Sequence, residues 1–160
     1  MILSLLASSV AHAQTSFTFE ELKDIYVNND KARAIHTIES KGYTPASADD
    51  FRELFGTDLK GILYSRAIDA SKIGIEFRDN KIYQVVFTDS VVSINSLLHE
   101  AEKTGFVLSH QEGEICKGYV KKRTSYFVWY SVLNGMPIET SMISIMEKTK
   151  SNRILYSHKW

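Results

Sequence analysis

The chain has 160 residues and carries 19 basic and 19 acidic side chains, so its formal net charge is zero at pH 7. A balanced charge gives no electrostatic reason to expect nucleic acid, an anionic membrane or a polyanionic substrate as the partner. The only cysteine, Cys116, cannot form a disulfide within the chain, so the fold must depend on an apolar core and not on a disulfide framework.

The first residues are typical of a cleaved export signal. Residues 1–13 form an apolar run that ends in Ala11-His12-Ala13, the small-x-small pattern that signal peptidase reads. The run is too short to span a bilayer, which needs about 20 apolar residues. The lack of basic residues ahead of it leaves open a start codon upstream of Met1. We therefore expect cleavage after Ala13 and a periplasmic or secreted protein without a membrane span.

The expected mature chain opens with helix signals. Thr18 and Glu21 have the spacing of a capping box, and the apolar spacing of a helix continues through Tyr26. A second helix is expected to run up to Gly42, because glycine readily adopts the left-handed conformation that ends a helix. A short third helix is expected within residues 47–56.

After the helices, apolar and polar residues alternate as in strands with one buried face. The alternation is clearest over residues 73–77. A three-residue loop at 78–80 would place Tyr83 opposite Ile75 and keep one face apolar in both strands. A two-residue loop would place Gln84 opposite Ile75 instead, so we predict the three-residue loop.

The second half repeats this order. A helix is expected from Asp89 or Ser90 to Gly105, because the apolar residues after the cap recur at helical spacing. Four extended segments follow, at residues 106–108, 115–120, 126–133 and 136–146. Asn134-Gly135, between the last two, is the strongest two-residue hairpin signal in the chain.

The two halves also share local patterns. Glu-x-x-Gly-aromatic occurs at residues 39–43 and again at 102–106, and Lys-Gly at the start of a strand with Arg at its end occurs at 60–66 and at 117–123. A diverged duplication explains both similarities, and chance resemblance of two segments with the same element order is the alternative.

These patterns predict an α+β fold of two related helix-then-antiparallel-meander units, residues 14–89 and 90–160, with the helices packed on one face of an antiparallel sheet. This order resembles that of the beta-lactamase inhibitor protein family and of other small exported proteins with tandem helix-and-sheet units. The resemblance covers residues 17–147 in outline, without the paired cysteines of that family and without a shared short motif. It implies a binding function exercised through a sheet face.

One segment of the second half comes close to a chemical signature, with His110, Glu114 and Cys116 at even spacing. If the chain stayed extended through Gly113, these side chains would line one face as a metal or catalytic site. The alternative is a hairpin with residues 111–113 as its loop and Gly113 left-handed, which would pair His110 with Glu114. Glycine readily leaves extended geometry, so we favour the turn and predict no metal, no cofactor and no catalytic residue.

The most aromatic stretch predicts a strand with two different faces. Alternation places Tyr126 and Tyr130 on one face with Glu139, while Phe127 and Trp129 lie on the other face, which has the character of a core. Tyrosine offers a large amphipathic contact area, so the first of these faces suits recognition, and a helix that covers it is the alternative. The candidate binding residues are Tyr126, Tyr130, Glu139 and Tyr83.

The sequence thus predicts an exported, non-catalytic binding protein. We expect its partner to be another protein, as for an inhibitor or an immunity protein, bound through an exposed sheet face. A small-ligand binder with a pocket between helices and sheet is one alternative. An enzyme that uses His110, Glu114 and Cys116 is the other.

Overall fold

The computed structural model describes residues 16–55, 60–133 and 140–150. The helices in these ranges are α1 (Phe19–Asn28), α2 (Lys31–Ser40), α3 (Ala48–Phe55) and α4 (Val91–Lys103). The strands are β1 (Thr44–Pro45), β2 (Gly61–Ser65), β3 (Lys72–Arg78), β4 (Lys81–Ser90), β5 (Val107–Glu112), β6 (Cys116–Val120), β7 (Tyr126–Leu133) and β8 (Thr140–Glu147). The predicted α+β class is confirmed. The expected export signal and Asn134-Gly135 lie outside the described residues.

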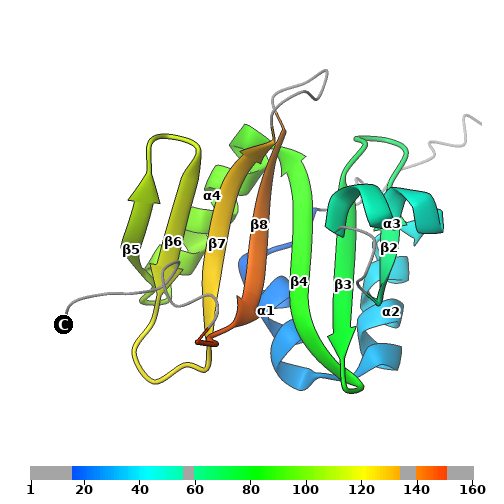
Figure 1. Ribbon diagram of the computed structural model, residues 1–160. Helices are drawn as coiled ribbons and strands as arrows, with labels where there is room; N and C mark the ends of the chain where they lie inside the picture. The colour runs from blue at the N-terminus through cyan, green and yellow to red at the C-terminus, as the bar shows by residue number, and fades with distance from the viewer. Residues whose placement is uncertain (1–15, 56–59, 134–139, 151–160) are drawn as a thin grey trace, which may run out of the picture.

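The strands form one antiparallel sheet in the order β1-β2-β3-β4-β8-β7-β6-β5 (Figure 1). The meander β1–β4 and the meander β5–β8 meet where β4 pairs with β8. In this pair Val85 lies opposite Ile145 and Phe87 lies opposite Ile143. The last strands of the two halves therefore make the centre of the sheet.

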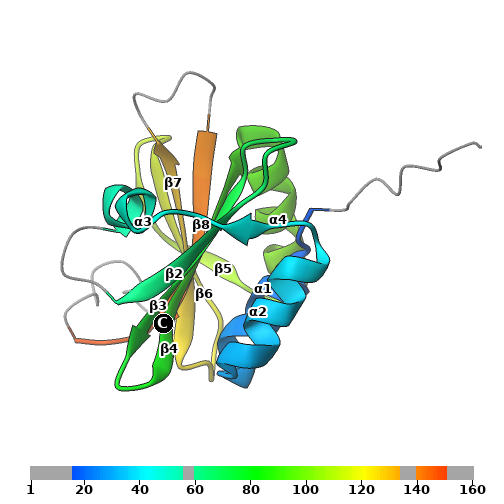
Figure 2. The same cartoon turned by 90° about the vertical axis from the view of Figure 1, so that its right-hand side faces the viewer.

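Helices cover the two faces of this sheet unequally. Figure 2 shows α1, α2 and α4 on one face and α3 on the other. The prediction that the helices share one face is therefore wrong for α3. Phe51 of α3 is buried against Gly61 of β2, where an added Cβ would come within 2.4 Å of the Phe51 ring. The absence of a side chain at Gly61 thus makes the space in which α3 packs.

Local sequence signals fix the helix ends as expected. The Thr18 backbone N–H donates to the Glu21 carboxylate at 2.8 Å, and the Glu21 N–H donates to the Thr18 hydroxyl at 3.3 Å. This confirms the capping box. Gly42 and Gly105 both have the left-handed φ expected of terminators, at 80° and 96°. None of the helices in the described ranges is both long and apolar enough to cross a membrane.

The main core lies between α1, α4 and the sheet. Phe19 of α1, Ile94 of α4 and Phe87 of β4 are completely buried there. Phe19 also meets Phe106 edge to face, with ring centroids 5.5 Å apart. Each such side chain contributes about 1.5–3 kcal/mol through burial, so this layer supplies much of the stabilisation of the fold.

The register of the β3–β4 hairpin differs from the prediction. The turn has two residues, Asp79 and Asn80, both with positive φ. Ile75 lies opposite Val85, because a bulge after Glu76 leaves Tyr83 without a partner across the pair. The predicted three-residue loop and the Ile75–Tyr83 pair are therefore wrong: the extra bulged residue, and not a longer loop, keeps the apolar residues on one face.

The β5–β6 hairpin confirms a turn but shifts it along the chain. Residues 113–115 form the turn, with Gly113 left-handed at φ 58°. His110 lies opposite Gly118, so the predicted loop at 111–113 and the His110–Glu114 pair are wrong. This register places His110 beside Trp129 across Gly118, and the two rings stack with centroids 5.9 Å apart. The stacked pair favours this register over the predicted one.

Candidate binding cleft

A cleft of about 600 Å³ is lined by residues at the ends of α1, β3, β4, β7 and β8, and the β3–β4 hairpin marks its place at the lower end of the sheet in Figure 1. Its walls come from the last turn of α1, the β3–β4 hairpin, the first residue of β7 and the end of β8. Three tyrosines from three different elements line it, Tyr26 of α1, Tyr83 of β4 and Tyr126 of β7. We call this site the tyrosine cleft.

Two of these tyrosines are anchored on the core. The rings of Tyr26 and Tyr126 pack with their centroids 5.3 Å apart, and the centroids of the Tyr126 and Phe106 rings are 5.9 Å apart. Contacts of this kind contribute about 0.5–1.5 kcal/mol each beyond the burial of area. The two rings therefore form a fixed wall of the tyrosine cleft.

Burial determines the ionisation of the tyrosine wall. It raises the pKa of Tyr26 to about 12, with further contributions from the Glu147 carboxylate and from Tyr83 and Tyr126. The pKa of Tyr126 is also raised, again mainly by burial. A phenol carries its proton at neutral pH even at the ordinary pKa of 10.0, and the raised pKa extends this state to alkaline pH, so each hydroxyl can donate a hydrogen bond to a ligand.

The third tyrosine holds an arginine in place. Tyr83 is the bulged residue of β4, and the guanidinium of Arg78 lies 3.4 Å from its ring centroid. The Arg78 Nε also donates to the Glu76 carboxylate at 2.7 Å, and the Glu76 side chain is only 2% exposed. Arg78 itself is 51% exposed. The guanidinium is thus oriented from two sides while part of it remains open to a ligand.

A backbone contact ties the helical wall to the hairpin. Asn29 follows α1 with a left-handed φ of 52°, and its side-chain oxygen accepts the Ile82 N–H at 2.5 Å. Asn29 and Ile82 both line the tyrosine cleft. The hydrogen bond joins the end of α1 to β4 and so orients two walls of the tyrosine cleft relative to each other.

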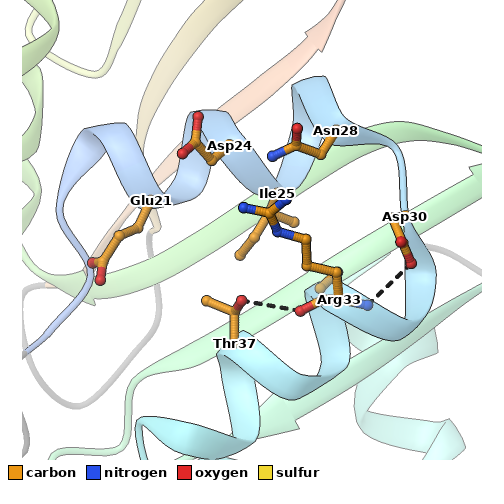
Figure 3. A pocket seen from close by; sticks show the side chains of 8 residues that line it. Glu21, Asp24, Ile25, Asn28, Asp30, Arg33 and Thr37 are labelled. Atoms are coloured by element: carbon orange, nitrogen blue, oxygen red, sulfur yellow. Dashed lines mark hydrogen bonds between the residues drawn. The ribbon is translucent and has the colours of Figure 1, made fainter.

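A smaller pocket of about 200 Å³ lies between α1 and α2 (Figure 3). Two of its carboxylates, those of Glu21 and Asp30, already have local partners. Glu21 caps α1 and pairs with Lys41 at 2.9 Å, and the Asp30 carboxylate accepts the Arg33 N–H at 3.1 Å. We therefore assign it a structural role at the helix pair.

The sequence-predicted binding residues separate into different places. Tyr83 and Tyr126 come together in the tyrosine cleft. Tyr130 is 4% exposed in the core on the helix-covered face, so the interpretation of an exposed tyrosine face is wrong and the alternative of a helix-covered face holds. Glu139 lies outside the described residues. Sequence reasoning missed Tyr26, whose helical spacing indicated only an apolar face.

The enzyme alternative finds no support in the placement of its three residues. Among the described residues, no hydrogen bond or ion pair joins any two of His110, Glu114 and Cys116. His110 stacks on Trp129, and the Glu114 carboxylate pairs with Lys117 at 3.8 Å. Burial, followed by the nearby Glu112, raises the pKa of Cys116, which disfavours the thiolate that a nucleophile needs.

Comparisons with known proteins add no identification. The chain matches no protein-family model, and neither the curated proteins nor the solved structures contain a significant match.

Proposed function

We propose that this chain is an exported, non-catalytic binding protein that takes a segment of another protein into the tyrosine cleft. The observation that carries the proposal is the convergence of Tyr26, Tyr83 and Tyr126 from separate elements around an oriented arginine, Arg78. Tyrosine and arginine, with tryptophan, are enriched among the residues that dominate the binding energy at protein interfaces, and here contacts within the fold orient them. Export rests on residues 1–13, and a relation between the two halves rests on their shared local patterns and on the four sheet strands that each half contributes.

A small-ligand binder is the second candidate function. The volume of about 600 Å³ lies within the range of small-molecule pockets, and the cleft opens between the end of α1 and the sheet. Its charged rim of Arg78, Lys81 and Glu147 favours a polar protein segment over an apolar small molecule.

The test is capture of the partner from the envelope fraction of the source cell. Tagged mature protein, residues 14–160, is cross-linked to its surroundings and recovered in three forms: the wild type, the double variant Tyr83→Ala with Arg78→Ala, and the control Ile68→Ala. The control alters a side chain that is 83% exposed. We expect one stoichiometric protein partner with the wild type and the control, and loss of it with the double variant. Recovery of the partner by the double variant would contradict the assignment of the cleft. Recovery of a small molecule in place of a protein would favour the second candidate.

A further inference from the structure

A second hollow continues the tyrosine cleft around the β3–β4 hairpin. It has a volume of about 500 Å³ and shares Asn29 and Ile82 with the cleft. Asp79 of the turn lines the tyrosine cleft, and its neighbour Asn80 lines the second hollow. The two hollows therefore adjoin at Asn29 and Ile82 and both reach the hairpin turn, and we call them together the hairpin groove.

The second hollow is basic although the chain as a whole is neutral. Lys31 and Lys60 line it, and no carboxylate does so among the described residues. The tyrosine cleft adds Arg78 and Lys81 against Asp79 and Glu147. The hairpin groove thus has four cationic and two anionic side chains in its walls, and because the Glu76 carboxylate compensates Arg78, the local excess of positive charge comes from the three lysines.

The lysines of the groove are available to a ligand. Lys31, Lys60 and Lys81 are all exposed, and none of them forms an ion pair with another described residue. Lys31 lies 5.2 Å from the centroid of the Phe77 ring, which holds its ammonium over the second hollow. No carboxylate of the described residues pairs with these three lysines, in contrast to Arg78, whose charge is compensated by Glu76.

We infer that the segment bound in the hairpin groove is an acidic stretch of a partner protein, with an aromatic or apolar side chain in the tyrosine cleft and carboxylates over Lys31 and Lys60. This inference rests on the proposed function and names the chemistry of its partner. Charge complementarity selects the acidic segment, and the length of two adjoining hollows suits an extended chain. Single-stranded nucleic acid is less suitable, because two of the three tyrosine rings are packed on the core or on each other and not free as stacking platforms.

The probes are three fluorescein-labelled peptides of the form X-X-Leu-Tyr-Leu-X-X, in which X is Glu, Gln or Lys, and a labelled oligothymidine. Affinities are measured by fluorescence anisotropy at about 50 mM and about 500 mM sodium chloride, because salt screens exposed charges. The site is mapped from amide shifts of the 15N-labelled mature chain, residues 14–160.

We expect the Glu peptide to bind most tightly and to lose its advantage over the Gln peptide at high salt. The variant Lys31→Ala with Lys60→Ala should weaken the Glu peptide about 2- to 25-fold, since an exposed ion pair changes affinity about 1.5- to 5-fold. The matched control is Arg52→Ala with Lys103→Ala, which removes two positive charges from α3 and α4 and should preserve the preference.

Equal affinities of the Glu and Gln peptides, or a preference that survives Lys31→Ala with Lys60→Ala, would overturn the inference. In that case, if Tyr83→Ala no longer bound either the Glu or the Gln peptide, the proposed function would still be supported. Absence of any peptide-induced shift in the tyrosine cleft would contradict both proposals. Tighter binding of the oligothymidine or of the Lys peptide would replace the acidic segment with another class of ligand.

Discussion

Replacement of Tyr126 by alanine tests how the tyrosine cleft is joined to the core. Tyr126 is the first residue of β7, and its ring packs against Tyr26 of α1 at 5.3 Å and against Phe106 at 5.9 Å. Among the described residues its hydroxyl forms no hydrogen bond. Nearly all of its contribution should therefore come from the ring, and Tyr126→Phe is the natural control.

The size of the effect follows from these contacts. Truncation of a fully buried aromatic side chain costs about 3–5 kcal/mol, and Tyr126 is only partly buried. We expect Tyr126→Ala to lower the free energy of unfolding by about 2–3 kcal/mol and Tyr126→Phe to lower it by less than about 0.5 kcal/mol. In a domain of this size, 1 kcal/mol corresponds to about 2–4 °C, so the alanine variant should melt about 4–12 °C lower.

Urea unfolding of the mature chain, residues 14–160, followed by circular dichroism provides the measurement. The slope of the free energy with urea should not change, because the surface exposed on unfolding stays nearly the same. A loss below about 0.5 kcal/mol in Tyr126→Ala, or equal losses in the alanine and phenylalanine variants, would refute the packing of β7 on α1 through this ring.

Other regions give three further predictions. Gly61→Ala should lower the free energy of unfolding in urea by about 1–3 kcal/mol, because the new Cβ would lie 2.3 Å from a carbonyl oxygen of β3 and 2.4 Å from the Phe51 ring. An unchanged unfolding midpoint would contradict the packing of α3 on β2. Burial tends to raise the pKa of Asp69, but hydrogen bonds from Arg66 and the neighbouring turn outweigh it and lower that pKa below 3.8. The stability that Asp69 contributes is therefore present above about pH 4 and lost on further acidification, so Asp69→Asn should reduce stability at pH 6 and flatten its decline in acid-unfolding curves. In spectrophotometric titration, Tyr26→Phe should remove one tyrosine that ionises near pH 12, and loss of one with an ordinary pKa near 10.0 would contradict the burial of this phenol. In the unfolded chain Tyr26 ionises at its ordinary pKa of 10.0, whereas in the folded chain it keeps its proton up to about pH 12. The free energy of unfolding of the wild type should therefore fall as the pH rises above 10.0.

The parts of the fold that depend on neighbouring residues could be read from the sequence. The capping box of Thr18 and Glu21 and the left-handed Gly42 and Gly105 need only a few adjacent residues, and all are present. The helix-then-strand order and the α+β class follow from periodicities of 3.6 and 2.

Features that depend on pairing across the sheet could not be predicted from the sequence. The bulge that leaves Tyr83 unpaired adds one residue to β4, and alternation along a single strand does not reveal it. The sequence left open, for a related reason, whether helices cover the Tyr126 and Tyr130 face of β7. Phe127 and Val128 are both completely buried, so both faces of this strand carry apolar residues and the pattern does not say which one the helices cover.

The candidate site was predictable only in part. The tyrosine-rich pattern indicated Tyr83 and Tyr126, which line the cleft. It also indicated Tyr130, which is buried in the core, and Glu139, which lies outside the described residues. The cleft exists because the end of α1 approaches the β3–β4 hairpin and the start of β7, and these contacts link residues far apart in the chain. Tyr26 could therefore be recognised as part of the site only from the tertiary structure.

Site-specific photo-cross-linking tests the central claim, binding at the tyrosine cleft, most directly. A benzophenone amino acid is introduced in separate variants in place of Tyr83 in the cleft, Trp129 on the sheet face opposite α1, and Val92, which is 80% exposed on α4. After irradiation in the source cell, we expect a cross-linked protein partner from position 83 and none from positions 92 and 129. A partner cross-linked from position 129 and not from 83 would contradict this prediction and move the binding site to the face of the sheet on which α3 lies.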